Sequence, residues 1–111
     1  MTKFWEECRK VGVKIEKNKD ILTALIEGDI DHHTAKDIRA TIDTAIEEIN
    51  PTALELDFKD VQFMDSSGIG LIMGRFRLMK LLNGNLKVVN VPDHIDRLIK
   101  LSGLKALGIV N

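Results

Sequence analysis

The side chains best suited to chemistry in this sequence are two neighbouring hydroxyls beside a carboxylate, in Met64-Asp65-Ser66-Ser67-Gly68. A helical pattern of apolar residues follows, so the segment is predicted to begin a helix. The first N–H groups of a helix lack internal acceptors and its N-terminus carries partial positive charge, so a phosphate is favoured there. Phosphorylation would add roughly 1.5 to 2 negative charges and three acceptor oxygens. Ser66 is therefore predicted to be a switch that a partner protein reads.

The helix after Ser66 carries two glycines on one side. Its apolar face comprises Ile69, Ile72, Phe76 and Met79. A second stripe, turned away from that face at 100° per residue, comprises Ser66, Gly70, Met73, Gly74 and Arg77. Each interior glycine costs about 1 kcal/mol relative to alanine. Two explanations stay open: a bare strip that a partner's backbone approaches, or close packing on the sheet.

A plain structural explanation also exists for the serine segment, because aspartate and serine are strongly preferred at helix starts. The other polar cluster comprises Asp29, Asp31, His32 and His33. Adjacent histidines at a helix start diverge by about 100°, and no pair has the spacing of zinc ligands. Asp31 is instead predicted to be the N-cap of a helix, and we expect neither a metal nor another cofactor.

Enzymatic motifs are absent around the serines. A hydrolase elbow requires Gly-x-Ser-x-Gly, and the glycine run 68–74 has neither a P-loop ending nor a dinucleotide fingerprint. We therefore expect no enzyme. The alternative from another class is a small serine hydrolase with Ser66 as nucleophile, for which His32 is the one candidate base.

The elements that must position these residues follow from apolar periodicity. Strands are expected at 11–16, 21–26, 53–58, 86–91 and 107–110, with a turn at 17–20 and a connection at 59–64. Helices are expected at 35–49, from an N-cap at Asp65 or Ser66 to about 82, and from Pro92 in a first turn to Gly103. Ile95, Leu98, Ile99 and Ser102 are assigned to the inward face of the last helix. This order predicts an α/β fold with a mixed sheet of about five strands, parallel in its later part, and helices packed on it.

Composition limits the functional classes. The 111 residues suit one domain, and 16 basic against 17 acidic residues give a net charge of −1, without the positive field that nucleic-acid binding needs. No apolar run approaches the roughly 20 residues that span a bilayer. The single cysteine, Cys8, needs no disulfide partner, which suits a reducing compartment. We expect a cytoplasmic protein with neither a nucleic-acid nor a membrane partner.

The sequence resembles the STAS-domain anti-sigma-factor antagonists, and among them the sporulation type of spore-forming Firmicutes. The resemblance covers about residues 11–110. Its motifs are Gly28-Asp29-Ile30-Asp31-His32-His33-Thr34-Ala35, Phe63-Met64-Asp65-Ser66-Ser67-Gly68-Ile69-Gly70, Gly74-Arg75, Pro92 and Ser102-Gly103-Leu104. Residues 1–10, with Phe4 and Trp5, are expected to be an N-terminal extension, and the chain ends at Asn111 where relatives often continue into a last helix.

The resemblance implies a partner-switching cycle. The unphosphorylated antagonist binds an anti-sigma factor serine kinase and releases its sigma factor, which promotes sporulation-specific transcription. ATP on the kinase then phosphorylates the serine that matches Ser66, and a serine phosphatase reverses this. The implied partner contacts are Asp29, Asp31, His32, Asp65, Ser66, Ser67, Gly68, Gly70, Met73, Gly74 and Arg75. The same resemblance allows a general-stress or stressosome pathway as the alternative.

Overall fold

Four strands form one mixed sheet in the computed structural model, which describes residues 12–110. The strands are β1 (Val13–Asn18), β2 (Ile21–Ile30), β3 (Ala53–Met64) and β4 (Asn85–Val89), in spatial order β1-β2-β3-β4. β1 and β2 are an antiparallel hairpin, while β2, β3 and β4 are parallel. The expected hairpin and parallel half are confirmed, with four strands in place of about five. Expectations for Cys8, Val11 and the extension 1–10 lie outside the described residues.

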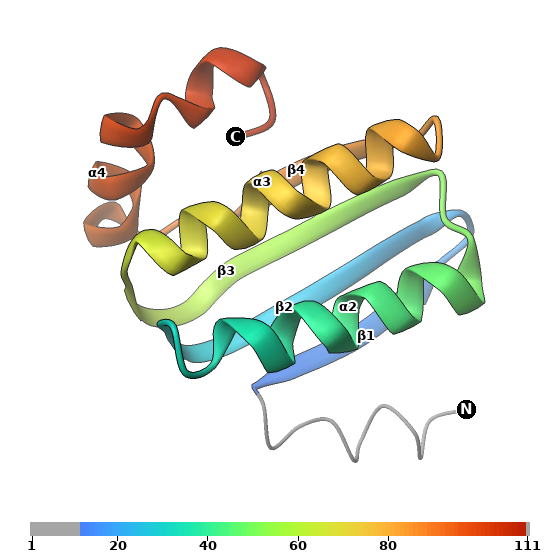
Figure 1. The fold of residues 1–111 in the computed structure, drawn as a ribbon, viewed down its shortest axis with the longest axis horizontal. Coiled ribbons are helices and arrows are strands. Elements are labelled where there is room, and N and C mark those ends of the chain that lie inside the picture. The colour runs from blue at the N-terminus through green and yellow to red at the C-terminus, as the bar shows by residue number, and fades with distance from the viewer. Residues whose placement is uncertain (1–11, 111) are drawn as a thin grey trace.

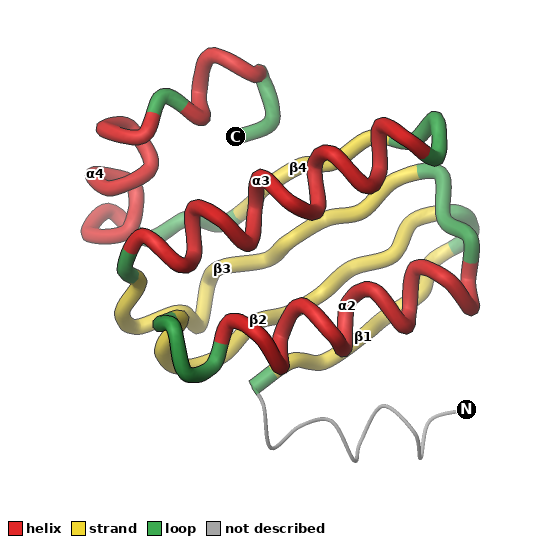
Figure 2. Tube along the Cα trace, in the orientation of Figure 1, coloured by secondary structure: helices red, strands yellow, loops and turns green. Residues whose placement is uncertain are grey.

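Two helices, α2 (Ala35–Ile49) and α3 (Ser66–Leu81), connect the parallel strands and lie side by side on one face of the sheet (Figure 1). Both begin at the same end of the molecule, because each follows the carboxyl end of a parallel strand. A third helix, α4 (Asp93–Ser102), and the short 3-10 helix η2 (Leu104–Leu107) lie beyond the N-terminal half of α3 (Figure 2). This arrangement places the starts of α2 and α3 at one edge of the sheet.

The core lies between the sheet and these two helices. Alternate residues of β2 and β3 turn toward the helices, as period-2 strands require. Fully buried members are Leu22, Ala24, Leu54, Leu56 and Phe58 from the strands, and Ile38, Ile42, Ile72 and Met79 from the helices. Burial of side chains of this size gives roughly 1.5 to 3 kcal/mol each. The helices are thereby fixed on the sheet, and their first turns with them.

β2 and β3 extend four and six residues beyond the expected ends, while β1 and β4 are shifted by one or two residues. The second strand was expected to end at Ile26. Instead, β2 accommodates two register shifts, between Leu25 and Glu27 and between Gly28 and Asp29. Gly28 has φ +87°, a conformation that favours glycine, so it allows the irregularity while pairing continues to Ile30.

The helix starts differ from expectation at one position. Asp31 is not the N-cap of α2: that position is Thr34, and the Asp31 carboxylate caps the preceding turn. Asp65 is the N-cap of α3, because its Oδ1 accepts from the backbone N–H of Ser67 at 2.8 Å. The inward face of α3 is also rotated slightly, since Leu71 is buried and Ile69 and Phe76 are only half-buried.

The C-terminal segment replaces the expected strand at 107–110 by η2 and a single parallel bridge between Val110 and Val88. Pro92 is the N-cap of α4 rather than part of its first turn, and Gly103 ends the helix at φ +83°. Ser102 is exposed rather than inward, and its hydroxyl donates to Ile99 O and accepts from Leu104 N.

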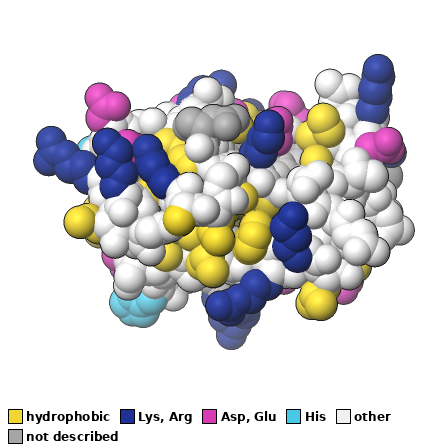
Figure 3. Space-filling model, turned by 90° about the horizontal axis from the view of Figure 1, so that it is seen from above, with side chains coloured by type: hydrophobic (Ala, Val, Ile, Leu, Met, Phe, Trp, Pro, Cys, Tyr) yellow, Lys and Arg dark blue, Asp and Glu magenta, His cyan; other side chains and the backbone are white. Residues whose placement is uncertain are grey.

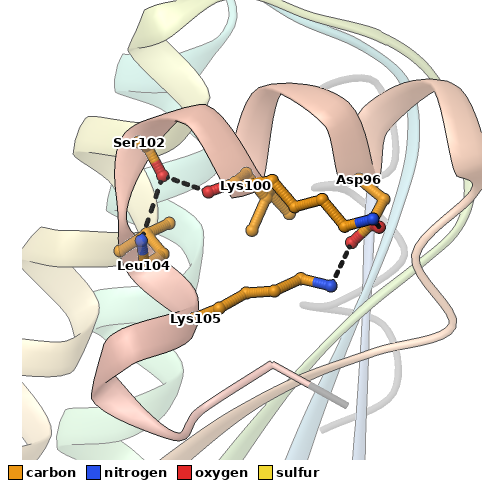
Figure 4. Close-up of polar contacts among 6 residues, drawn as sticks. Asp96, Lys100, Ser102, Leu104 and Lys105 are labelled. Carbon is orange, nitrogen blue, oxygen red and sulfur yellow. Dashed lines mark hydrogen bonds and ion pairs between the residues drawn. The ribbon is translucent and has the colours of Figure 1, made fainter.

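Asp96 links α4 to η2. Its carboxylate contacts Lys100 Nζ at 3.4 Å and Lys105 Nζ at 3.0 Å (Figure 4). Because Lys105 belongs to η2, the ion pair and the Ser102 hydrogen bonds hold the chain in a compact turn. Of the residues that were expected to form a strand, only Val110 forms a bridge to the sheet.

The end of the sheet away from the starts of α2 and α3 carries an apolar hollow of about 370 Å³ between α3, β4 and the segment 107–109. Its lining includes the first residues of β2, β3 and β4, namely Ile21, Ala53 and Asn85. Hydrophobic side chains gather on the face seen from the β4 side (Figure 3). Ser66 lies just beyond the carboxyl end of β3, so this hollow and Ser66 are at opposite ends of the sheet.

Candidate functional site

The two predicted polar segments meet at the carboxyl end of the sheet. Ile30 at the end of β2 pairs with Met64 at the end of β3, and Asp65 N donates to Ile30 O at 3.1 Å. The loop after β2 and the first turn of α3 therefore lie side by side. Clefts beyond the carboxyl ends of parallel strands are frequent binding positions in α/β folds.

Ser66 is the exposed first residue of α3. Its hydroxyl forms no hydrogen bond within the described residues, because the Asp65 carboxylate already caps the helix. Ser67 is half-buried, in contrast to Ser66. The hydroxyl of Ser66 is therefore the one that a large partner can reach more easily.

The loop after β2 presents a fixed carboxylate. Asp31 Oδ1 accepts from Thr34 N at 3.0 Å and from His33 N at 2.9 Å. The backbone N–H of Thr34 lowers the pKa of Asp31 most, and His33 lowers it further, while partial desolvation opposes them. The Thr34 hydroxyl donates to Asp29 O at 2.9 Å and so closes the loop. Asp31 is therefore held as an anion next to the start of α3.

Asp29 and His32 are exposed in the same loop, and the ring centroids of His32 and His33 are 4.0 Å apart. Within residues 12–110 no group of three His, Cys, Asp or Glu could hold a metal. No hydrogen bond in this range joins His32 to Ser66, so the base-to-nucleophile contact of a hydrolase is not formed. The loop offers charge and hydrogen bonds rather than a catalytic dyad.

The glycines of α3 have different environments. Gly68 is buried, and a Cβ there would overlap the Met64 side chain. A Cβ at Gly70 or Gly74 would have nothing within 4 Å. Close packing therefore explains Gly68, while Gly70 and Gly74 leave a bare strip on α3.

Arg75 lies inside the molecule rather than on that strip. It is 7% exposed, and its Nε is 2.9 Å from Asp43 Oδ1 of α2. Burial lowers the pKa of Arg75 and raises that of Asp43, and the opposite charge of each partner counteracts these shifts. The residue that the sequence placed on the contact surface thus joins the two helices, and Met73 beside it is half-buried.

Sequence reasoning missed the basic wall across from this strip. Lys36 and Arg39 of α2 line a groove together with Gly70, Gly74 and Arg75 of α3. A signal existed, because positions 36, 39 and 43 lie on one side of a helix at 100° per residue. It could be used only once the two helices were known to be neighbours.

Residues 12–109 match the STAS domain family, and the chain belongs to that family. Within it, the chain is 36% identical over 92 residues to the anti-sigma F factor antagonist of Paenibacillus polymyxa, covering 83% of this chain and 79% of the relative. It is 32% identical to the anti-sigma-B factor antagonist of Bacillus subtilis, covering 86% and 85%.

Solved structures agree with these relatives. The anti-sigma factor antagonist SpoIIAA in its unphosphorylated form superposes with a TM-score of 0.78 at 30% identity, covering 89% of this chain and 85% of that one. SpoIIAA of Bacillus in the phosphorylated form gives 0.71 at 30% identity, covering 89% and 88%. The resemblance seen in the sequence is confirmed. The relatives are regulatory binding proteins, so the chain is not an enzyme. The alternative of a small serine hydrolase is therefore rejected.

In residues 12–110 no helix is long and apolar enough to cross a membrane.

Proposed function

We propose that this protein is an anti-sigma factor antagonist that binds an anti-sigma factor serine kinase while Ser66 is unphosphorylated, and so releases a sigma factor in the cytoplasm. The observation that carries the proposal is the exposed Ser66 hydroxyl, unbonded within residues 12–110, at the start of α3. The similarity to antagonists of sigma F and sigma B supports it.

Phosphorylation of Ser66 acts through charge. A phosphate at the N-terminus of α3 is tolerated by the fold, because the first N–H groups and the helix dipole favour an anion. The same phosphate stands near Asp65 and the Asp31 loop and turns the partner-facing surface strongly negative. Every 1.4 kcal/mol of repulsion or desolvation weakens binding about tenfold. Release of the kinase follows, and a serine phosphatase restores the binding state.

The contact surface combines exposed and supporting residues. Asp29, Asp31 and His32 offer polar contacts from the loop after β2. Ser67, Gly70, Met73 and Gly74 extend the surface along α3, with Asp65 at its start. Gly68 is buried and positions the helix, while Arg75 is buried and pairs with Asp43 of α2.

A sporulation pathway is the favoured setting, because the sigma F antagonist of Paenibacillus polymyxa is 36% identical over 92 residues. A general-stress pathway is the second candidate, because the sigma-B antagonist of Bacillus subtilis is 32% identical over 95 residues. The two settings are separated by mixing the protein with each type of anti-sigma kinase from its own genome. The kinase that forms the complex identifies the pathway.

The deciding experiment mixes the protein with that kinase and ATP and maps phosphate by mass spectrometry. Ser66→Ala should keep binding and lose the phosphate, and Ser66→Asp should weaken binding by about tenfold or more through like-charge contact. Ser67→Ala is the matched control and should still be phosphorylated. A phosphate on Ser67 alone, or tight binding by Ser66→Asp, would refute the charge switch at Ser66.

A further inference from the structure

The groove between α2 and α3 is lined by basic side chains. It encloses about 350 Å³, and its lining residues are Ala35, Lys36, Arg39, Ser67, Gly70, Leu71, Gly74 and Arg75. Three of these side chains are cationic and none is acidic. The bare strip at Gly70 and Gly74 forms one side of the groove. A Cβ at either position would have no atom within 4 Å, so this side of the groove is open.

Arg75 is the one buried cation of the groove lining. The residue is 93% buried, and its one polar contact within residues 12–110 joins Nε to Asp43 Oδ1. No described residue accepts a hydrogen bond from its two terminal nitrogens, although a guanidinium carries five N–H donors in a planar fork. An arginine that lines a groove suits a carboxylate, which can accept two parallel hydrogen bonds from a guanidinium.

The balance of charge favours an anion as well. Asp43 neutralises one of the three cations from behind Arg75, and the positive charge of Arg39 is close enough to lower the pKa of Arg75. Lys36 and Arg39 are exposed at the rim, where they would attract an approaching acidic group. The groove thus retains excess positive charge.

We propose that this groove receives an aspartate or glutamate side chain of the anti-sigma factor, with Arg75 at its base and Lys36 and Arg39 at its rim. The inference rests on the proposed function and names the chemistry of one contact in it. To enter the groove, an acidic side chain of the partner passes the bare strip of α3. Gly70→Ala or Gly74→Ala would narrow the groove along this strip.

The groove also couples to the switch, because Ser67 lines it and Ser66 is the preceding residue. A phosphate on Ser66 places a second anion beside the same group of cations. The phosphate and the partner's carboxylate then repel each other and compete for Arg39 and Lys36. Release on phosphorylation therefore includes loss of this contact as well as general repulsion.

The test measures binding of the anti-sigma factor from the same genome by calorimetry. Arg39→Glu should weaken the complex by about tenfold or more, and Lys36→Glu by a smaller factor, because both reverse charge at the rim. Both residues are exposed, so the fold should persist. Lys17→Glu is the matched control, because Lys17 is an exposed residue of β1, and this variant should bind like wild type. Gly74→Ala should weaken binding without loss of thermal stability, because its Cβ meets no atom.

The identity of the occupant is tested by charge exchange. Each acidic residue on the face of the anti-sigma factor that binds the antagonist is changed to lysine, and one such variant should restore tight binding to Arg39→Glu. Wild-type affinity for both rim variants would overturn the groove contact while leaving the proposed function intact. Failure of the wild-type protein to bind either kind of anti-sigma factor would overturn the proposed function, and the groove contact with it.

Discussion

Ser66 and Ser67 are identical neighbours with different environments, because one residue of a helix turns by about 100°. Ser66 is exposed, whereas Ser67 is half-buried and lines the groove between the helices. Asp65 makes the difference useful. Its carboxylate caps the helix through Ser67 N, so the Ser66 hydroxyl is not needed for the fold. A residue that does no structural work can be modified without unfolding the domain.

Gly68 and Gly70 give a matched pair of substitutions within one helix. Gly68→Ala should destabilise the protein by about 1 to 3 kcal/mol, because the new methyl group overlaps Met64 and the core must shift. Gly70→Ala should stabilise it by up to about 1 kcal/mol, since alanine favours the helix and the space is open. Urea unfolding of both variants measures the two free energies. Equal effects would mean that the Met64 side chain moves aside without cost.

Individual elements were predicted with different success, for reasons visible in particular residues. The alternation in β1, the apolar run of β2 and the 3.6-residue period of α2 predicted those elements correctly, because local pattern and burial agree. The end of β2 was predicted too early, at the residues before Gly28. A glycine can end a strand or allow a bulge within it, and Gly28 allows a bulge. Asp31 and Thr34 compete for the helix start, and only the turn geometry places the cap at Thr34.

The contact between α2 and α3 depends on the ion pair of Arg75 with Asp43, which no local pattern revealed. Asp43→Asn should cost about 2 to 3 kcal/mol, less than a fully buried pair because the Asp43 side chain is 33% exposed. The double variant Asp43→Asn/Arg75→Met should lose less than the single one, since it leaves no unpaired charge in the interior.

Thermal and urea unfolding of the single and double variants measure the coupling between Asp43 and Arg75. The control is Asp37→Asn, at an exposed position of α2. A double variant that is less stable than Asp43→Asn alone would show that packing by the arginine stem outweighs the cost of its buried charge.

At the scale of the molecule, the order of elements predicted the α/β class, and the resemblance implied that both polar segments contact the partner. The structure gives the reason that they meet, because parallel strands bring their carboxyl ends to one edge whatever the details of each loop. The groove could not be predicted, since it depends on how α2 and α3 pack against each other. The C-terminal turn also escaped prediction. Its structure depends on Asp96, Lys105 and Ser102, which are polar contacts between residues that apolar periodicity ignores.

The dependence of stability on pH tests the electrostatics of the whole domain. Hydrogen bonds from the Thr34 and His33 backbone lower the pKa of Asp31 below its ordinary value of 3.8, and Lys105 and Lys100 lower that of Asp96. As pH falls below 3.8, the unfolded chain takes up these protons first. Stability that is fully present above that pH is therefore lost as pH falls through the folded-state values.

We expect the urea midpoint of the wild type to fall steeply below about pH 4. Asp31→Asn/Asp96→Asn should be less stable at neutral pH but less sensitive to acid, because asparagine cannot titrate. If the variant loses stability with acid as steeply as the wild type, other carboxylates govern the acid transition, and the charged loop beside Ser66 contributes nothing to it.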